Sequence, residues 1–126
     1  MPSILLLEDN ADMLTMLSQV LEWNGHEVLA GRNGNEGLSL LSKAANPPGL
    51  IICDMQMPGM DGTTFLEHVR ATPAWAKIPF VMMSARSSDD ERDNAMSLGA
   101  DGFLTKPFGI DDFNALLTEW GFPADT

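Results

Sequence analysis

Five short apolar runs alternate with five longer segments in which apolar residues recur every three or four positions. The short runs are typical of strands, and the longer spacing is that of one face of a helix. Repeated strand–helix units predict an α/β fold, a parallel sheet covered by helices, because a parallel strand needs a crossover and a helix supplies it. The expected strands are about 3–7, 27–30, 50–53, 80–84 and 102–105, and the expected helices are about 11–24, 35–44, 63–71, 88–99 and 110–120.

The first, third and fourth strands are apolar along nearly their whole length. A strand that is buried on both faces reads this way, so these three are expected at the centre of the sheet. The fourth helix has a thin apolar face, formed mainly by Ala95, Met96 and Leu98, and should be the least firmly docked helix.

Length and charge restrict the possible functions. At 126 residues the chain predicts a single domain, with a core of about 3–121 and a short tail of 122–126. A net charge of −11 opposes binding to nucleic acid or to an anionic membrane, since both require a basic surface. No apolar run approaches the roughly 20 residues of a membrane helix, and a cytoplasmic location is expected. The lone Cys53 is expected to be a buried core residue.

Reactive polar residues lie at or just after the ends of four of the expected strands: Glu8 and Asp9, then Asp54, then Ser84, then Lys106. Ligands of an open parallel sheet bind beyond the carboxyl ends of its strands, so these side chains are expected at one edge. A single carboxylate there is usually a helix cap or a loop residue. Five polar groups converging on one edge favour a functional site instead.

Three carboxylates at one edge repel one another, by roughly 4 kcal/mol per pair at about 4 Å and an effective dielectric of about 20. Lys106 offsets one charge. An all-oxygen cluster also suits Mg²⁺, which often binds phosphate oxygens as well. Asp54 could then act as a nucleophile toward phosphorus, with Lys106 and Ser84 assisting at the phosphoryl oxygens. The alternative that the residues leave open is a structural cation site or a purely electrostatic network.

Four segments together are similar to the receiver domain of two-component response regulators, over essentially the entire chain and in the same order. The resemblance implies a flavodoxin-like (βα)5 fold with the strand order 2-1-3-4-5. The segments are Glu8-Asp9, Asp54-Met55-Gln56-Met57-Pro58-Gly59-Met60-Asp61-Gly62, Ser84-Ala85 and Gly99-Ala100-Asp101-Gly102-Phe103-Leu104-Thr105-Lys106-Pro107-Phe108.

The resemblance implies that Asp54 is the phosphoacceptor. It implies that Asp9, Asp54 and the backbone carbonyl of Gln56 ligate Mg²⁺ directly, while Glu8 acts through water, and that Lys106 contacts the phosphoryl group. A sensor histidine kinase or a histidine phosphotransfer protein would be the donor, docking on the exposed side of the first helix.

The remaining implied features concern the switch. Ser84 would follow the phosphate, Phe103 would turn inward behind it, and the bond before Pro107 would be cis. The fourth helix, fifth strand and fifth helix would form the surface that controls binding of a downstream protein, which the sequence does not identify. The fifth helix has no basic residue, unlike salt-bridged receiver dimers, and a monomer is expected.

Gln56 and Arg86 occupy the positions that flank the path of hydrolytic water in receivers. We expect their long side chains to lengthen the lifetime of the phosphate. The alternative is that both are simply exposed loop residues.

The leading hypothesis is therefore a signalling switch that catalyses only its own phosphorylation and dephosphorylation. The main alternative is a Mg²⁺-dependent phosphohydrolase that forms an aspartyl phosphate on external substrates. It is disfavoured because Gln56 stands where a second catalytic aspartate would be needed. A flavodoxin-like cofactor binder is disfavoured because the strand ends carry acids rather than a glycine-rich phosphate cradle. A scaffold without phosphorylation is disfavoured because all five site residues are present.

Overall fold

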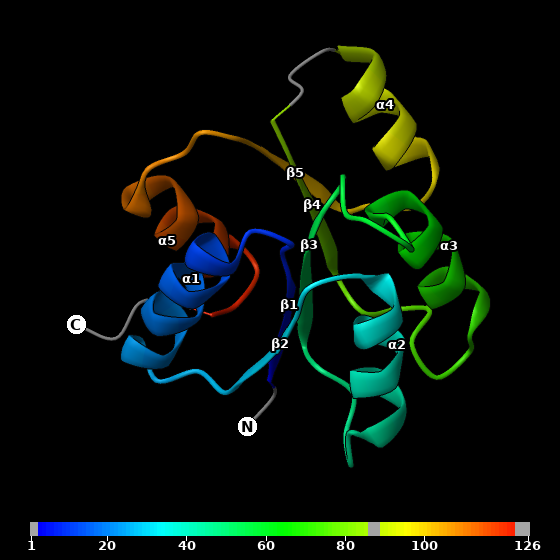
Figure 1. The fold of residues 1–126 in the computed structure, drawn as a ribbon, viewed down its shortest axis with the longest axis horizontal. Coiled ribbons are helices and arrows are strands. Elements are labelled where there is room, and N and C mark those ends of the chain that lie inside the picture. Colours follow the sequence, from blue (N-terminus) through cyan, green and yellow to red (C-terminus); the bar gives the residue numbers. More distant parts are fainter. Residues whose placement is uncertain (1–2, 86–88, 123–126) are drawn as a thin grey trace.

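The computed structural model describes residues 3–85 and 89–122, and it contains a parallel sheet with helices on both faces (Figure 1). The strands lie in the order β2-β1-β3-β4-β5, which confirms the predicted topology. The elements are β1 (Ile4–Leu7), α1 (Ala11–Trp23), β2 (Val28–Gly31), α2 (Gly34–Lys43), β3 (Leu50–Asp54), α3 (Gly62–Ala71), β4 (Phe80–Ser84), α4 (Asp89–Ser97), β5 (Gly102–Thr105) and α5 (Ile110–Glu119).

The observed elements differ little from the predicted ones, and local hydrogen bonds explain the differences. Asn10 caps α1, its side chain accepting the N–H of Met13 at 3.0 Å. α2 begins earlier than predicted because Asn33 caps it. β3 continues through Asp54, which pairs with Met83 of β4. Ser88, the expected first residue of the fourth helix, lies outside the described residues.

The core lies in two layers. α1 and α5 cover one face of the sheet, whereas α2, α3 and α4 cover the other (Figure 1). Phe65 and Phe80 are fully buried in the second layer, and Phe113 is fully buried in the first. Every residue of β1, β3 and β4 is buried, which confirms the prediction that these strands are central.

α4 is docked lightly, as predicted, but not by all of the expected residues. Ala95 is its one buried residue, and Leu98, just beyond the helix, packs on the core. The prediction for Met96 is wrong, because its side chain is 39% exposed. Successive residues of a helix point about 100° apart, so Met96 turns away when Ala95 faces the sheet.

The connections from β1 and β3 leave the sheet in opposite directions. β1 leads to α1 on one face, and β3 leads to α3 on the other (Figure 1). Because the two strands are neighbours, a hollow opens between their carboxyl ends, and this is where a doubly wound sheet binds ligands. Within the described part of the chain, no helix has both the length and the apolar character needed to cross a bilayer.

Candidate functional site

Three acidic residues meet at the carboxyl ends of β1 and β3. Glu8 and Asp9 directly follow β1, and Asp54 is the last residue of β3. One carboxylate oxygen from each lies within 4.8 Å of the others. Glu8 and Asp54 are buried, 1% and 4% exposed, while Asp9 is half-buried at the rim. The structure thus brings together the three acids that the sequence predicted as metal ligands.

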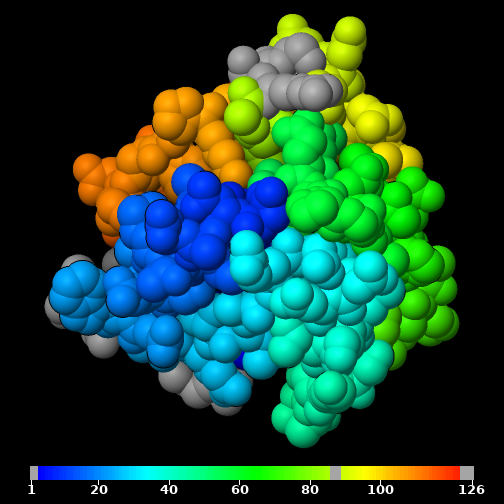
Figure 2. Space-filling view, viewed as in Figure 1, coloured from blue at the N-terminus to red at the C-terminus, as the bar shows by residue number. Residues whose placement is uncertain are grey.

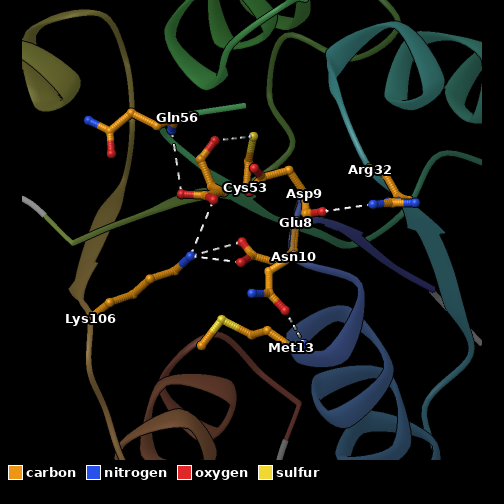
Figure 3. A network of polar contacts seen from close by, with 9 residues as sticks. Glu8, Asp9, Asn10, Met13, Arg32, Cys53, Gln56 and Lys106 are labelled. Atoms are coloured by element: carbon orange, nitrogen blue, oxygen red, sulfur yellow. Dashed lines mark hydrogen bonds and ion pairs between the residues drawn. The ribbon is translucent and has the colours of Figure 1, made fainter. Parts of the chain in front are cut away.

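Lys106, just after β5, reaches across the sheet edge to this cluster (Figure 3). Its Nζ donates to both carboxylate oxygens of Glu8 at 2.8 and 2.9 Å. The same atom lies 3.2 Å from Oδ2 of Asp54. The following peptide bond, Lys106–Pro107, is cis, as the resemblance implies. One cation therefore faces three carboxylates, and negative charge remains in excess.

Burial and the excess negative charge together shift the pKa values of Asp54, Asp9 and Lys106. Burial, followed by a hydrogen bond and repulsion from Glu8, raises the pKa of Asp54 above its ordinary value. Burial, followed by interaction with Asp54, raises the pKa of Asp9. Burial alone would lower the pKa of Lys106, but its contacts with Glu8 and Asp54 raise it overall. The lysine is thus held as a cation, whereas Asp9 and Asp54 are destabilised as anions until further positive charge arrives.

The cluster opens to solvent through a shallow pocket. Its lining comes from Asp9 and from four residues of the β3–α3 loop, Gln56, Met57, Pro58 and Asp61. The segments that follow β1 and β3 adjoin each other on the face seen in Figure 2, in blue and green. A ligand can therefore approach the acidic cluster from the side on which Asp9 lines this pocket.

The β3–α3 loop passes very close to Asp54. A Cβ placed on Gly62 would lie 2.4 Å from the carbonyl oxygen of Asp54, so this position requires glycine. Asp61 caps α3, its side chain accepting the N–H of Thr64 at 3.0 Å. The backbone bond from Thr64 is the main cause that lowers the pKa of Asp61. The Asp-Gly pair thus fixes the turn that carries the pocket wall.

The other predicted site residues that the structure describes differ in their burial and in their contacts. Ser84 is fully buried at the end of β4, and its carbonyl oxygen accepts the N–H of Lys106 at 2.8 Å. Phe103 is half-buried on β5 and packs against the core beneath α2, α3 and α4. The side chain of Gln56 is exposed, and its N–H donates to Oδ1 of Asp54 at 3.4 Å (Figure 3). Arg86 lies outside the described residues.

Sequence reasoning missed one contact at the site. The guanidinium of Arg32, in the β2–α2 loop, donates to the backbone carbonyl of Asp9 at 3.2 Å (Figure 3). Nothing in the sequence marks Arg32, because the contact joins two loops that only the finished sheet brings together. The helix cap of Asp61 has a signal that could have been used, an acidic residue directly before an amphipathic segment.

The residues present fit a hard divalent cation. The ligands offered by Glu8, Asp9 and Asp54 are all oxygens, and one of the three acids faces solvent. The raised pKa values of Asp9 and Asp54 favour added positive charge. An ion with few protein ligands that keeps waters and binds phosphate matches this set. A buried carboxylate beside a lysine and such an ion has the surroundings of a nucleophile for phosphorus.

Comparisons with known proteins agree with this geometry. The response regulator receiver domain family matches residues 4–118. The KDP operon transcriptional regulatory protein KdpE of Escherichia coli is 35% identical over 117 residues, which span 93% of this chain and 50% of KdpE. The phosphate regulon regulatory protein PhoB of Escherichia coli is 33% identical over 105 residues, 83% of this chain and 45% of PhoB. This chain therefore spans about half the length of these relatives.

Solved structures show the same fold over nearly the whole chain. The chemotaxis response regulator CheY4 of Vibrio cholerae superposes with a TM-score of 0.88 at 29% identity, covering 95% of this chain and 98% of CheY4. The phosphorylated cyanobacterial phytochrome response regulator RcpA superposes with a TM-score of 0.84 at 25% identity, covering 94% of this chain and 93% of RcpA.

Proposed function

This chain belongs to the response regulator receiver domain family, and from that premise we propose that Asp54 accepts a phosphoryl group from a phosphohistidine and holds it as a signal. The observation that carries the proposal is the burial of Asp54 within reach of two further acids and Lys106, beside a solvent-open pocket that Asp9 lines. The signalling unit would be the single domain of about 3–121.

The chemical step follows from the site. A carboxylate oxygen of Asp54 attacks phosphorus, the bond from phosphorus to the imidazole nitrogen breaks, and the departing histidine takes a proton. Lys106 lies 3.2 Å from Asp54 and would compensate the charge of the phosphoryl oxygens. Bound Mg²⁺, held by Asp9, Asp54 and the carbonyl of Gln56 with Glu8 acting through water, would neutralise more of that charge. The hydroxyl of Ser84 would donate a hydrogen bond to one phosphoryl oxygen.

The output would be a change of the surface formed by α4, β5 and α5. Ser84 ends the strand that precedes α4, and Phe103 packs beneath the same layer, so both could relay the state of Asp54. A downstream protein would read this surface. Direct binding of nucleic acid is opposed by the net charge of −11. We propose a cytoplasmic, monomeric domain that catalyses only its own phosphorylation and dephosphorylation.

The phosphodonor would dock on α1 and the adjoining end of α5. Met16 and Trp23 of α1 are 43% and 85% exposed, and Ile110 of α5 is 43% exposed. All three line one hollow between the helices. α1 and α5 contain no basic residue, so an apolar surface with basic flanks on the histidine-bearing protein would complement them.

A small phosphodonor tests the proposal without the cognate kinase. Incubation with acetyl phosphate and Mg²⁺ should give a single phosphoryl addition by intact mass, labile to alkali and absent when a chelator removes the metal. Beryllofluoride with Mg²⁺ should block the addition. No labile addition would refute the phosphoacceptor role. Steady turnover of many organic phosphates would instead support the phosphohydrolase.

The lifetime of the phosphate provides a second prediction. We expect the double substitution Gln56→Ala and Arg86→Ala to shorten the half-life of the aspartyl phosphate several-fold, because water reaches phosphorus more easily past small side chains. Gln56 lines the pocket beside Asp9, and its side chain is exposed. The decay is followed by intact mass after removal of the donor. An unchanged half-life would show that both are merely surface residues.

A further inference from the structure

A second cation, Arg32, lies beside the acidic cluster on the side opposite Lys106 (Figure 3). Arg32 directly follows β2 and Lys106 directly follows β5, and these are the two edge strands of the sheet. Nη2 of Arg32 donates to the backbone carbonyl of Asp9 at 3.2 Å. Asp9 is the member of the cluster that lines the solvent-open pocket. Arg32 is therefore the cation next to the entrance of the site.

The backbone of Arg32 is held against the strand that carries the acids. The carbonyl of Gly31 accepts the N–H of Glu8 at 3.1 Å, so the end of β2 lies directly beside the end of β1. The backbone N–H of Arg32 donates to Oε1 of Glu36 at 3.1 Å, which joins it to the first turn of α2. The backbone of Arg32 is thus fixed next to Asp9, while its side chain is exposed.

The two cations differ in what they already bind. Nζ of Lys106 donates to both carboxylate oxygens of Glu8 and lies 3.2 Å from Asp54. A guanidinium has five N–H donors. Within residues 3–85 and 89–122, the guanidinium of Arg32 makes one hydrogen bond, to the neutral carbonyl of Asp9, and no ion pair. Because Arg32 is exposed, its other donors are available to an anion that arrives from solvent.

Arg70 provides the comparison with an arginine whose role is structural. Its guanidinium donates to three backbone carbonyls and to the carboxylate of Asp101, and its side chain is 20% exposed. An arginine with that many partners holds segments of the chain together and has little capacity for a ligand. Arg32 differs in both respects, since it is exposed and has one partner among the described side chains and carbonyls.

We propose that Arg32 selects the phosphodonor by attracting an anionic leaving group. Small acyl phosphates would then be favoured over donors whose leaving group is neutral. This inference rests on the proposed phosphorylation of Asp54, and it adds a preference among donors to that role. Lys106 and the buried acids receive the phosphoryl group, so the rest of the donor extends toward solvent, where the pocket opens beside Asp9.

The charge of the leaving group follows from the chemistry of the donor. When a carboxylate oxygen of Asp54 attacks phosphorus in acetyl phosphate, the P–O bond breaks and acetate departs with the bonding electron pair. A guanidinium beside the pocket offsets the negative charge that develops on this carboxylate. In phosphoramidate the P–N bond breaks instead, and the nitrogen, already protonated in the donor, departs as neutral ammonia. Arg32 gains no comparable interaction with it.

Phosphorylation rates with these two donors test the proposal. The unsubstituted protein and Arg32→Gln are each incubated with Mg²⁺ and either acetyl phosphate or phosphoramidate, and intact mass follows the phosphoryl addition. We expect Arg32→Gln to lower the ratio of the acetyl phosphate rate to the phosphoramidate rate about fivefold, the factor supplied by two unit charges about 4 Å apart in water. The ratio cancels any effect on Asp9 or the metal, because both donors use the same site.

Further variants separate the local charge of Arg32 from its shape and from net charge. Arg32→Lys keeps the cation and should hold the ratio within about twofold of the unsubstituted value. Arg32→Glu reverses the charge and should lower the ratio more than Arg32→Gln does. Lys43→Gln is the matched control, because Lys43 is an exposed cation in the last turn of α2 and its loss changes the net charge equally. Its ratio should equal that of the unsubstituted protein.

The outcomes separate donor selection from the phosphoacceptor role. If both donors phosphorylate the protein and Arg32→Gln leaves their ratio unchanged, selection by Arg32 is refuted and the phosphoacceptor role stands. An equal fall in the ratio for Lys43→Gln would trace the effect to net charge and would also refute it. If neither donor phosphorylates the unsubstituted protein, the phosphoacceptor role fails and donor selection fails with it.

Discussion

Asp54→Asn is expected to abolish the Mg²⁺-dependent phosphoryl addition entirely. The amide has nearly the shape of the carboxylate but lacks its nucleophilic oxygen, and one of the three acidic ligands is lost with it. Intact mass after incubation with acetyl phosphate measures the effect. A variant that still gains one alkali-labile phosphoryl group would place the acceptor elsewhere and contradict the assignment.

The matched control is Asp61→Asn. Asp61 lines the same pocket and carries the same group, but its carboxylate caps α3. Asparagine caps a helix about as well as aspartate, so this variant should fold and be phosphorylated normally. If Asp61→Asn lost the addition as completely as Asp54→Asn, the experiment would report the charge of the pocket and not the nucleophile.

The Asp54→Asn variant should also be more stable than the unsubstituted protein in the absence of metal. The raised pKa of Asp54 means that the folded state binds its proton more tightly than the unfolded chain does. The contribution of Asp54 to the free energy of unfolding therefore falls as the pH rises from its ordinary pKa of 3.8 to its raised pKa in the folded protein. The difference in stability between Asp54→Asn and the unsubstituted protein should be largest near neutral pH and should vanish below pH 3.8. Thermal unfolding at several pH values measures it.

The fold was largely predictable because it depends on local patterns. Apolar runs with polar ends placed the strands, and the fully apolar runs correctly identified β1, β3 and β4 as central. Polar residues at strand ends then meet at one edge, which is why Glu8, Asp9, Asp54 and Lys106 could be expected to converge. The parallel topology imposes this convergence on any residues at those positions.

The missed contacts depend on which side chain reaches which backbone atom. Arg70 bonds to carbonyl groups, and a carbonyl has no sequence signature. Met96 was expected on the core face because it is apolar, but the exact rotation of the helix put Ala95 there instead. A helix with so few apolar residues does not fix its own rotation. The hydrogen bonds from Arg70 to the carbonyl of Gly99, just beyond α4, supply a constraint that the apolar pattern lacks.

Lys106→Met is expected to lower the free energy of unfolding by about 3–5 kcal/mol, the usual cost of removing one partner of a buried ion pair. Lys106 bonds to both oxygens of Glu8, which is 1% exposed, so the substitution leaves that carboxylate buried without its cation. Methionine keeps an unbranched apolar side chain of similar length, so lost packing contributes little. A loss of this size is a large part of the roughly 5–15 kcal/mol that stabilises a typical domain.

Urea denaturation in the absence of metal measures the loss, and two further variants identify its cause. Lys77→Met removes an exposed lysine and should cost less than about 1 kcal/mol. Adding Asp54→Asn to Lys106→Met should recover part of the stability, because one of the repelling charges is gone, so the two effects should not add. Mg²⁺ should also stabilise Lys106→Met at neutral pH, since the ion restores positive charge to the same acids.

A loss below about 1 kcal/mol for Lys106→Met would mean that Lys106 behaves as a surface charge. It would then not be the fixed counter-charge on which the phosphoacceptor site depends.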